Sequence, residues 1–330
     1  SDAGSVRDMS IYLSLDAGGS KCAAMLFDDG LNLLGSGLSG GVNTTQTTLD
    51  EARANVVDCL NQVFQNVQID QIDRFYYSFV GPVHVLREEI TRRVRVICEC
   101  GMSEPEAGMY AGALRKEGLL ALAGTGSDVF WVKHSPNGRR VVVGSWGPIL
   151  GDQGSGTWIG QRVLREVVKL SEGWGEQTIL LDMIRKAWAL EHDYDMVRVV
   201  HQSPAPFRKV ASLTVLVGEA ARQNDAFALK VLREAGEQMA LQTICLIERE
   251  QVPPEMRAVT CCGGAWKAHN AMFERFREML QERYPGLSVQ KPWFEHLMAG
   301  PARTLIERGI EIPEAKRLLE THFPKYVIRW

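Results

Sequence analysis

The chain has 330 residues, of which 45% are hydrophobic and 23% are charged, and its formal net charge is −3. These values are those of an ordinary globular protein, and they exclude a disordered or fibrous chain. The 37 basic and 40 acidic residues leave no basic excess, so we expect no nucleic-acid partner and no binding to a membrane surface.

Targeting signals are not apparent in the sequence. No uncharged apolar run approaches the roughly 18 residues that a membrane-spanning helix needs, and no signal-peptide pattern is present. The seven Cys residues are scattered and form no C-x-x-C pair, so we expect reduced thiols and a cytoplasmic location. Residues 1–8 are small and polar, and we interpret Met9 as the native start.

The first predicted elements form a strand, a glycine-rich loop and a hairpin. An apolar run at Ile11–Leu15 ends in the loop DAGGSK at 16–21, and a second run follows at Cys22–Phe27. A turn then leads into a third strand at Leu31–Leu34. Apolar residues at 3.6-residue spacing predict a helix over Thr48–Val67.

The same order recurs later in the chain. A strand at Gly118–Ala123 ends in the loop GTGS at 124–127, and Asp128–Lys133 continues it. A turn at 136–138 and a return strand at Arg140–Gly144 complete the unit. We interpret the two units as a duplicated architecture, with chance likeness of two glycine-rich hairpins as the alternative.

The second half of the sequence is predicted to be mostly helical. A helix over Thr157–Leu170 is followed by helices up to Leu280, one of them long, with a short strand at Ala258–Cys262 that ends in Gly263-Gly264. Two closing helices are expected at Ala302–Arg308 and Pro313–Leu319.

Three apolar strands therefore end in glycine-containing loops. Glycines let backbone N–H groups converge on an anion, because no Cβ blocks the approach. The three loops together predict a nucleotide site, for which Asp16 offers a magnesium ligand and Lys21 a positive charge near phosphate. For each glycine taken alone, a tight turn remains the alternative.

Other sites are excluded or disfavoured by their motifs. There is no Walker A loop, no G-x-G-x-x-G that opens a βαβ unit and no H-E-x-x-H zinc motif. Gly37–Gly41 matches the G-x-S-x-G of a hydrolase nucleophile elbow, but no helix is predicted directly after Ser39. We expect Trp131, Trp146, Trp158 and Trp266 to be core or cleft-wall residues.

Four segments carry a family resemblance: DAGGSK at 16–21, GTGS at 124–127, WGPILGDQGSGTWIG at 146–160 and CCGGAWK at 261–267. In order and spacing they resemble the N-acetylglucosamine kinases among the BadF/BadG/BcrA/BcrD ATPases, within the actin, heat-shock chaperone and sugar-kinase superfamily. The resemblance extends from about Ile11 to Gly300.

The resemblance implies an α/β fold of two ribonuclease-H-like domains around a nucleotide cleft. The implied domains are 10–112 and 113–312, the second with a helical insertion, and a closing helix at about 313–330 is expected to return to the first. The implied cofactors are ATP and Mg²⁺, and the implied partner is a small-molecule sugar. A homodimer is a further expected option.

The resemblance also assigns roles to individual residues. Those implied for ATP are Asp16, Gly18, Gly19, Ser20, Lys21, Thr125, Gly126, Ser127, Gly263, Gly264 and Lys267. Asp16 is in addition the implied metal ligand. Those implied for the sugar are Asn43, Gly124, Gly144, Ser145 and Asp152. Several positions depart from the family pattern: Glu106 stands in place of Asp, Gln153 in place of Glu, Ser145 in place of Gly and Ser20 in place of Thr, and Gly300-Pro301-Ala302 matches the family's closing segment poorly.

The implied general base is Glu106, aligned with a one-residue gap to the family's catalytic Asp, and Asp152 is a second implied catalytic residue. Each has a structural alternative. Glu106 follows Pro105 and suits the first turn of a helix, where an acid is stabilised by the helix dipole. Asp152 could cap the helix that follows it, and Asn43 could be an ordinary turn residue.

We therefore predict an ATP-dependent kinase that transfers the γ-phosphate to a hydroxyl of an amino sugar such as N-acetylglucosamine. The alternative is a nucleotide-dependent ATPase switch of the BadF type without sugar transfer. Some relatives of that type carry a cysteine-bound iron–sulfur cluster, and Cys98 and Cys100 are the only close non-adjacent cysteines here.

Overall fold

The computed structural model describes residues 9–45, 47–133 and 141–330, and the chain divides into two compact units. Unit 1 comprises Ser1–Lys116 and Pro292–Arg329, and unit 2 comprises Glu117–Lys291 with Trp330. The chain thus returns to unit 1 at Pro292, before the expected residue 313, and the first of the two closing helices belongs to unit 1.

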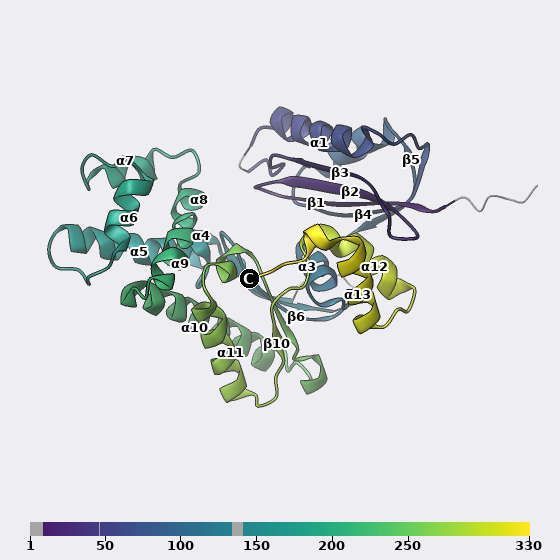
Figure 1. Ribbon diagram of the computed structural model, residues 1–330. Coiled ribbons are helices and arrows are strands. Elements are labelled where there is room, and N and C mark those ends of the chain that lie inside the picture. Colours follow the sequence, from purple (N-terminus) through teal and green to yellow (C-terminus); the bar gives the residue numbers. More distant parts are fainter. Residues whose placement is uncertain (1–8, 46, 134–140) are drawn as a thin grey trace, which may run out of the picture. The chain divides into compact units, whose positions relative to one another are not determined.

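Unit 1 is built on a five-stranded sheet (Figure 1). Its strand order is β3-β2-β1-β4-β5, in which β1 is antiparallel to β2 and parallel to β4. The strands are β1 (Ile11–Ala17), β2 (Cys22–Asp28), β3 (Leu33–Ser39), β4 (Gln71–Phe79) and β5 (Arg95–Gly101). The strands β1 and β2 are buried along nearly their whole length, as is typical of strands covered by helices on both faces.

Helices cover both faces of this sheet. Leu13 and Leu15 point to the face that carries α1 and α2, whereas Tyr12 points to the face that carries α3, α12 and α13. The helices are α1 (Leu49–Phe64), α2 (Val83–Thr91), α3 (Glu104–Ala113), α12 (Ala299–Glu307) and α13 (Ile312–His322). The predicted helix after Thr48 is confirmed, with Thr48 as its N-cap.

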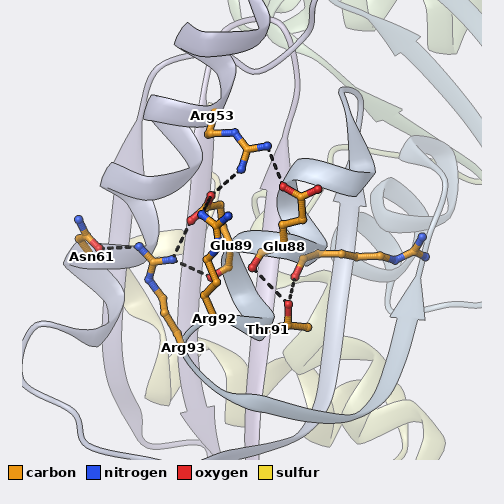
Figure 2. A network of polar contacts seen from close by, with 8 residues as sticks. Arg53, Asn61, Glu88, Glu89, Thr91, Arg92 and Arg93 are labelled. Atoms are coloured by element: carbon orange, nitrogen blue, oxygen red, sulfur yellow. Dashed lines mark hydrogen bonds and ion pairs between the residues drawn. The ribbon is translucent and has the colours of Figure 1, made fainter.

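A polar network joins α1 to α2, as Figure 2 shows. The Glu89 carboxylate is only 4% exposed, and it accepts hydrogen bonds from Arg53 at 2.7 Å, Arg92 at 2.9 Å and Arg93 at 3.2 Å. Glu88, which is largely exposed, pairs with Arg53 at 2.8 Å. Three guanidinium groups therefore compensate one buried charge, which would be costly to bury alone.

The returning chain makes a specific close contact with β1. The Ser14 hydroxyl donates to the carbonyl of Leu297 at 2.7 Å and accepts from the N–H of Gly300 at 3.2 Å. A Cβ at Gly300 would lie 2.5 Å from the Ser14 oxygen, so only glycine lets α12 approach the strand this closely. This contact places α12 on the sheet of unit 1.

Unit 2 repeats the topology of unit 1. Its sheet has the order β10-β9-β6-β7-β8, with β6 antiparallel to β7 and parallel to β9. The strands are β6 (Gly118–Ala123), β7 (Ser127–Val132), β8 (Val141–Gly144), β9 (Val259–Cys262) and β10 (Val289–Gln290). Read with β6 in the place of β1, the order is the same, so the predicted duplication is confirmed. The predicted turn at 136–138 lies outside the described residues.

Most helices of unit 2 lie between β8 and β9 in the chain. They are α4 (Gly147–Leu150), α5 (Gly156–Ser171), α6 (Leu180–Ala187), α7 (Asp195–His201), α8 (Pro206–Ala211), α9 (Leu213–Arg222) and α10 (Ala226–Arg249), and α11 (Asn270–Arg283) follows β9. Along α10 the residues spaced by four from Phe227 to Met239 are buried, as predicted. Within the described ranges, no helix is long and apolar enough to cross a bilayer.

Candidate active site

The predicted site residues of unit 1 gather at one edge of its sheet. The strands β1, β3, β4 and β5 run in the same direction, because β2 is antiparallel to both of its neighbours. Asp16 with the loop 18–21, the segment 41–43 and the start of α3 therefore all follow carboxyl ends of strands at this edge. Ligands of open α/β sheets bind at such edges.

The loop 18–21 and the segment 41–43 are in direct contact. The N–H of Gly18 donates to the carbonyl of Lys21 at 3.0 Å, and the carbonyl of Gly18 accepts from the N–H groups of Val42 at 2.8 Å and Asn43 at 3.3 Å. A Cβ at Gly41 would lie 2.2 Å from the carbonyl oxygen of Gly19, so a glycine is required there. The predicted sugar residue Asn43 thus adjoins the predicted phosphate loop.

The Asn43 side chain stabilises a turn through its oxygen, whereas its amide N–H groups are not used in this turn. Its Oδ1 accepts from the N–H and the hydroxyl of Thr45 at 3.0 and 2.9 Å, as expected for a turn residue. Its amide nitrogen makes no hydrogen bond within the part of the chain that the structure describes. The turn fixes the orientation of the side chain and leaves that amide for a ligand.

Asp16 and Lys21 differ in their interactions with other side chains of the protein. Among the described residues, the half-buried Asp16 carboxylate has no hydrogen-bond or ion-pair partner. The Lys21 ammonium lies 3.6 Å from the Glu295 carboxylate, and both side chains are about 40% exposed. An ion pair this exposed is weak, so a phosphate could compete for the lysine. Sequence reasoning missed Glu295, because it comes from a distant part of the chain.

Glu106 lies in the capping box of α3. Its Oε2 accepts from the N–H and from the hydroxyl of Ser103, both at 2.7 Å, and its own N–H donates to the Ser103 hydroxyl at 3.4 Å. The expected alternative role as a first-turn acid is therefore confirmed. The side chain is exposed, and its Oε1 has no hydrogen bond to the described residues.

In unit 2 the predicted residues also gather at one sheet edge, because β6, β8 and β9 run in the same direction. The loop 124–127 is closed by a hydrogen bond of 2.9 Å from the N–H of Gly124 to the carbonyl of Gly126. Gly263 has a φ of +108°, and a Cβ there would lie 2.3 Å from the carbonyl oxygen of Ala123. The second and third glycine loops are thus neighbours.

Asp152 supports the loop 124–127 rather than the following helix. Its Oδ1 accepts from the N–H of Ser127 at 3.2 Å, and its backbone has a φ of +60°. The N-cap of α5 is Ser155, whose hydroxyl accepts from the N–H of Trp158, so the alternative of Asp152 as the cap is wrong. Burial raises the pKa of Asp152, the Ser127 hydrogen bond lowers it, and the nearby Asp128 raises it, with a net upward shift.

Two predicted hydroxyl ligands are engaged within the protein. The fully buried Ser127 donates its hydroxyl to the carbonyl of Gln153 at 2.8 Å, and its N–H is used by Asp152. Ser145 donates its hydroxyl to Asp128 at 2.7 Å. Both donors of Ser127 are thus occupied, so it holds the loop and Asp152 in place instead of offering a donor to phosphate.

Thr157 is a loop-positioning residue that sequence reasoning missed. Its hydroxyl and its N–H both donate to the carbonyl of Thr125, at 2.7 and 3.2 Å. Thr125 is itself exposed at the tip of the loop. The available signal was a Thr in the first turn of α5, a turn in which backbone donors are unpaired.

The remaining predicted residues of unit 2 are accessible. A Cβ at Gly264 would meet no described atom within 4 Å, and Lys267 is exposed. Trp266 is fully buried and donates its ring N–H to Ala121 at 3.1 Å, as expected of a core residue. Trp146 is 71% exposed, so it is not a core residue of unit 2, and its cleft-wall alternative stays a prediction.

The serine of the G-x-S-x-G match has no catalytic setting. Ser39 is the last residue of β3, and its hydroxyl donates to the carbonyl of Asn55 at 2.6 Å. The next helix, α1, begins only at Leu49. A nucleophile elbow needs the helix directly after the serine, so the hydrolase interpretation is excluded.

Comparison with known proteins places this architecture in a family. The model of the BadF/BadG/BcrA/BcrD ATPase family matches residues 13–295. The chain therefore belongs to this ATPase family, and the family resemblance of the four sequence segments is confirmed.

Two relatives that are similar in sequence carry the names of sugar kinases. The chain is 28% identical over 188 residues to the N-acetylmuramic acid/N-acetylglucosamine kinase of Clostridium acetobutylicum, covering 57% of this chain and 61% of that protein. It is 24% identical to a glucosamine kinase of Vibrio cholerae, covering 72% and 81%. The match thus spans less than two thirds of the first relative's length.

A solved structure shares the fold. A Chromobacterium violaceum protein solved under the provisional name N-acetylglucosamine kinase has a TM-score of 0.66 and 19% identity, covering 90% of this chain and 99% of that one. Together with the two five-stranded sheets, this confirms the predicted α/β fold of the actin and sugar-kinase type.

Proposed function

We propose that this protein is an ATP-dependent kinase that phosphorylates a hydroxyl of an amino sugar. The observation that carries the proposal is that the glycine loops of both units lie at carboxyl sheet edges, each with an acidic residue beside it, Asp16 in one and Asp152 in the other. Membership of an ATPase family and the names of the relatives support the same class.

The nucleotide side of the proposal rests on the loops. Gly124 and Gly264 leave open space where a side chain would project, so backbone N–H groups can approach phosphate oxygens there. Asp16 has a carboxylate with no partner among the described residues, which fits Mg²⁺ bound by one carboxylate together with nucleotide phosphates. When bound, magnesium would supply charge neutralisation on those phosphates.

The acceptor side rests on residues that the fold already orients. The turn of Asn43 fixes its side chain and leaves its amide nitrogen without a partner among the described residues, and Asp152 accepts a hydrogen bond from the Ser127 N–H. We propose that these two residues bind the sugar and that Glu106 takes the proton of the attacking hydroxyl on its Oε1. Proton removal by a positioned carboxylate and fixed orientation of the reactants would then accelerate the phosphoryl transfer.

The test is release of ADP from Mg-ATP with a panel of amino sugars and neutral hexoses. The proposal expects turnover that depends on an N-acetylated or free amino sugar, with glucose and mannose much poorer. ATP hydrolysis that is unchanged by every sugar would favour the second candidate, an ATPase switch, for which the family membership is the supporting observation.

A further inference from the structure

A pair of thiols lies on the edge strand of unit 1. Cys98 and Cys100 are two positions apart on β5, so their side chains share one face, and their Sγ atoms are 3.7 Å apart. The Cys98 side chain is exposed and Cys100 is 9% exposed. The pair is therefore open to solvent through Cys98.

The charged neighbours of this pair are two arginines, Arg74 and Arg303, which both pair with the Glu307 carboxylate. Across the strand pair, Arg74 is opposite Cys98 and Tyr76 is opposite Cys100. Burial and the neighbouring Cys98 raise the pKa of the Cys100 thiol to about 11, while the positive charges of Arg303 and Arg74 act to lower it. Cys100 thus keeps its proton at neutral pH, and binding of a cation by this thiol releases that proton.

Strand geometry disfavours a disulfide between these two residues. Side chains two apart on a strand have Cβ atoms about 6.5 Å apart. A disulfide needs Cβ atoms at about 3.5–4.5 Å, so the backbone would have to distort. By contrast, a single atom bonded to both sulfurs could bridge them at their present separation, without distorting the backbone.

We propose that Cys98 and Cys100 form a dithiol site that chelates a soft, thiophilic ion. Thiolate ligands select soft ions, and two ligands on one rigid strand bind as a chelate with a high effective concentration of the second thiol. No group of three or more metal-ligating side chains gathers in residues 9–45, 47–133 and 141–330, so the site suits ions that accept two sulfur ligands. Trivalent arsenic in an organoarsenical is such a species.

The probe is phenylarsine oxide, whose reaction with a dithiol is balanced without an oxidant. Two S–H bonds break, two As–S bonds form, and the arsenic-bound oxygen leaves as water with the two protons. The chain supplies two matched controls. Cys22 and Cys59 interact with each other but are both fully buried, whereas Cys245 is exposed and single.

The experiment is intact-mass analysis of the folded, reduced protein after treatment with phenylarsine oxide. We expect one phenylarsenic adduct per chain that survives excess monothiol and is removed by a small dithiol. The adduct should be lost in both Cys98→Ser and Cys100→Ser and be retained in Cys245→Ser. Circular dichroism of each variant checks the fold, and because the readout is mass, it does not depend on kinase activity.

Two results would overturn the proposal. The first is no adduct in the folded wild-type protein. The second is an adduct that persists in a folded Cys98→Ser variant, since it would then belong to other thiols. Cys98 is exposed, so this variant should fold as the wild type does.

Discussion

Asp152 fixes the end of the glycine loop 124–127, because its Oδ1 lies 3.2 Å from the backbone nitrogen of Ser127 and accepts a hydrogen bond from its N–H. The same carboxylate lies 3.0 Å from where a Cβ of Gly126 would be. One side chain therefore fixes the loop backbone and keeps a charge next to the proposed acceptor site. The first prediction follows from this double role.

Asp152→Asn should stabilise the protein and reduce its activity. Because burial raises the pKa of Asp152 in the fold above its unfolded value of 3.8, the ionised form is disfavoured by folding. This group favours folding below pH 3.8, and that contribution is lost as the pH rises through the folded pKa. The amide keeps an Oδ1 acceptor for Ser127 and removes the buried charge.

Thermal melts should therefore show a higher Tm for Asp152→Asn at pH 7, with a difference that shrinks below pH 3.8. In the same variant, loss of a charged hydrogen bond to the acceptor should lower kcat/KM by about 10- to 100-fold. A variant with lower Tm and full activity would show that Asp152 acts only by holding the loop.

Gly264→Val should block the nucleotide without unfolding unit 2. No described atom lies within 4 Å of the added Cβ, so the side chain would fill only the space proposed for ATP. Calorimetry should show ATP affinity lost and Tm unchanged. Gly126→Val is the contrasting variant, because its side chain would press on Asp152, and we expect it to lower Tm as well. Wild-type ATP affinity in Gly264→Val would remove this loop from the site.

Glu89→Gln should destabilise unit 1 in a pH-dependent way. Burial alone would raise the pKa of Glu89, but the hydrogen bonds from Arg53 and Arg93 outweigh it, so the net shift is downward from 4.5. The charged network therefore stabilises the fold fully above pH 4.5, and this contribution is lost as the pH falls through the folded pKa.

Urea unfolding at pH 7 should give a loss of about 1.5–3 kcal/mol for Glu89→Gln, the range for hydrogen bonds to charged groups. The loss should shrink at pH values below 4. Glu88→Gln is the matched control, because this exposed neighbour shares Arg53 and its loss should cost clearly less. Equal losses in the two variants would contradict the role assigned to burial.

Glu106 can be tested for proton transfer separately from capping. Ser103→Ala removes the partner of the capping box but leaves the Glu106 carboxylate, whereas Glu106→Gln removes the charge. If Glu106 is the base, Glu106→Gln should lower kcat by about 10²–10⁴-fold while Ser103→Ala keeps most of it. If it is only a cap, Ser103→Ala should cost about 1 kcal/mol of stability. Glu106→Gln should then cost only about 0.3–1 kcal/mol, because Gln can also close the capping box, and neither variant should lose turnover. In that case Glu104→Gln, in the same first turn, is the next variant to measure.

The repeated topology could be predicted from the sequence because it is encoded locally. Each unit begins with a continuous apolar run, a glycine loop and a hairpin, and both β1 and β6 form where those runs predict strands. Such runs are continuous because both faces of the strand are covered, as helices cover both faces of the sheet in unit 1. A strand with one face in solvent would instead alternate apolar and polar residues. The glycine loops follow because they end these strands.

What the sequence did not predict depends on contacts between distant residues. The return of the chain at Pro292 brings Gly300 against Ser14, and no local pattern marks such a pair. Ser103 precedes Glu106 by three residues, and this spacing is typical of a capping box. The family resemblance instead implied that the Glu106 carboxylate is a base. The hydroxyl of Ser127 was read as a ligand because its partner, the carbonyl of Gln153, lies 26 residues away.

The central claim, phosphoryl transfer to a sugar hydroxyl, is tested most directly by ³¹P NMR of a reaction with Mg-ATP and N-acetylglucosamine or glucosamine. The account predicts a new phosphomonoester resonance that grows with ADP, requires the sugar and is strongly reduced in Asp152→Asn. Inorganic phosphate as the only product, formed at the same rate with and without each sugar, would contradict it.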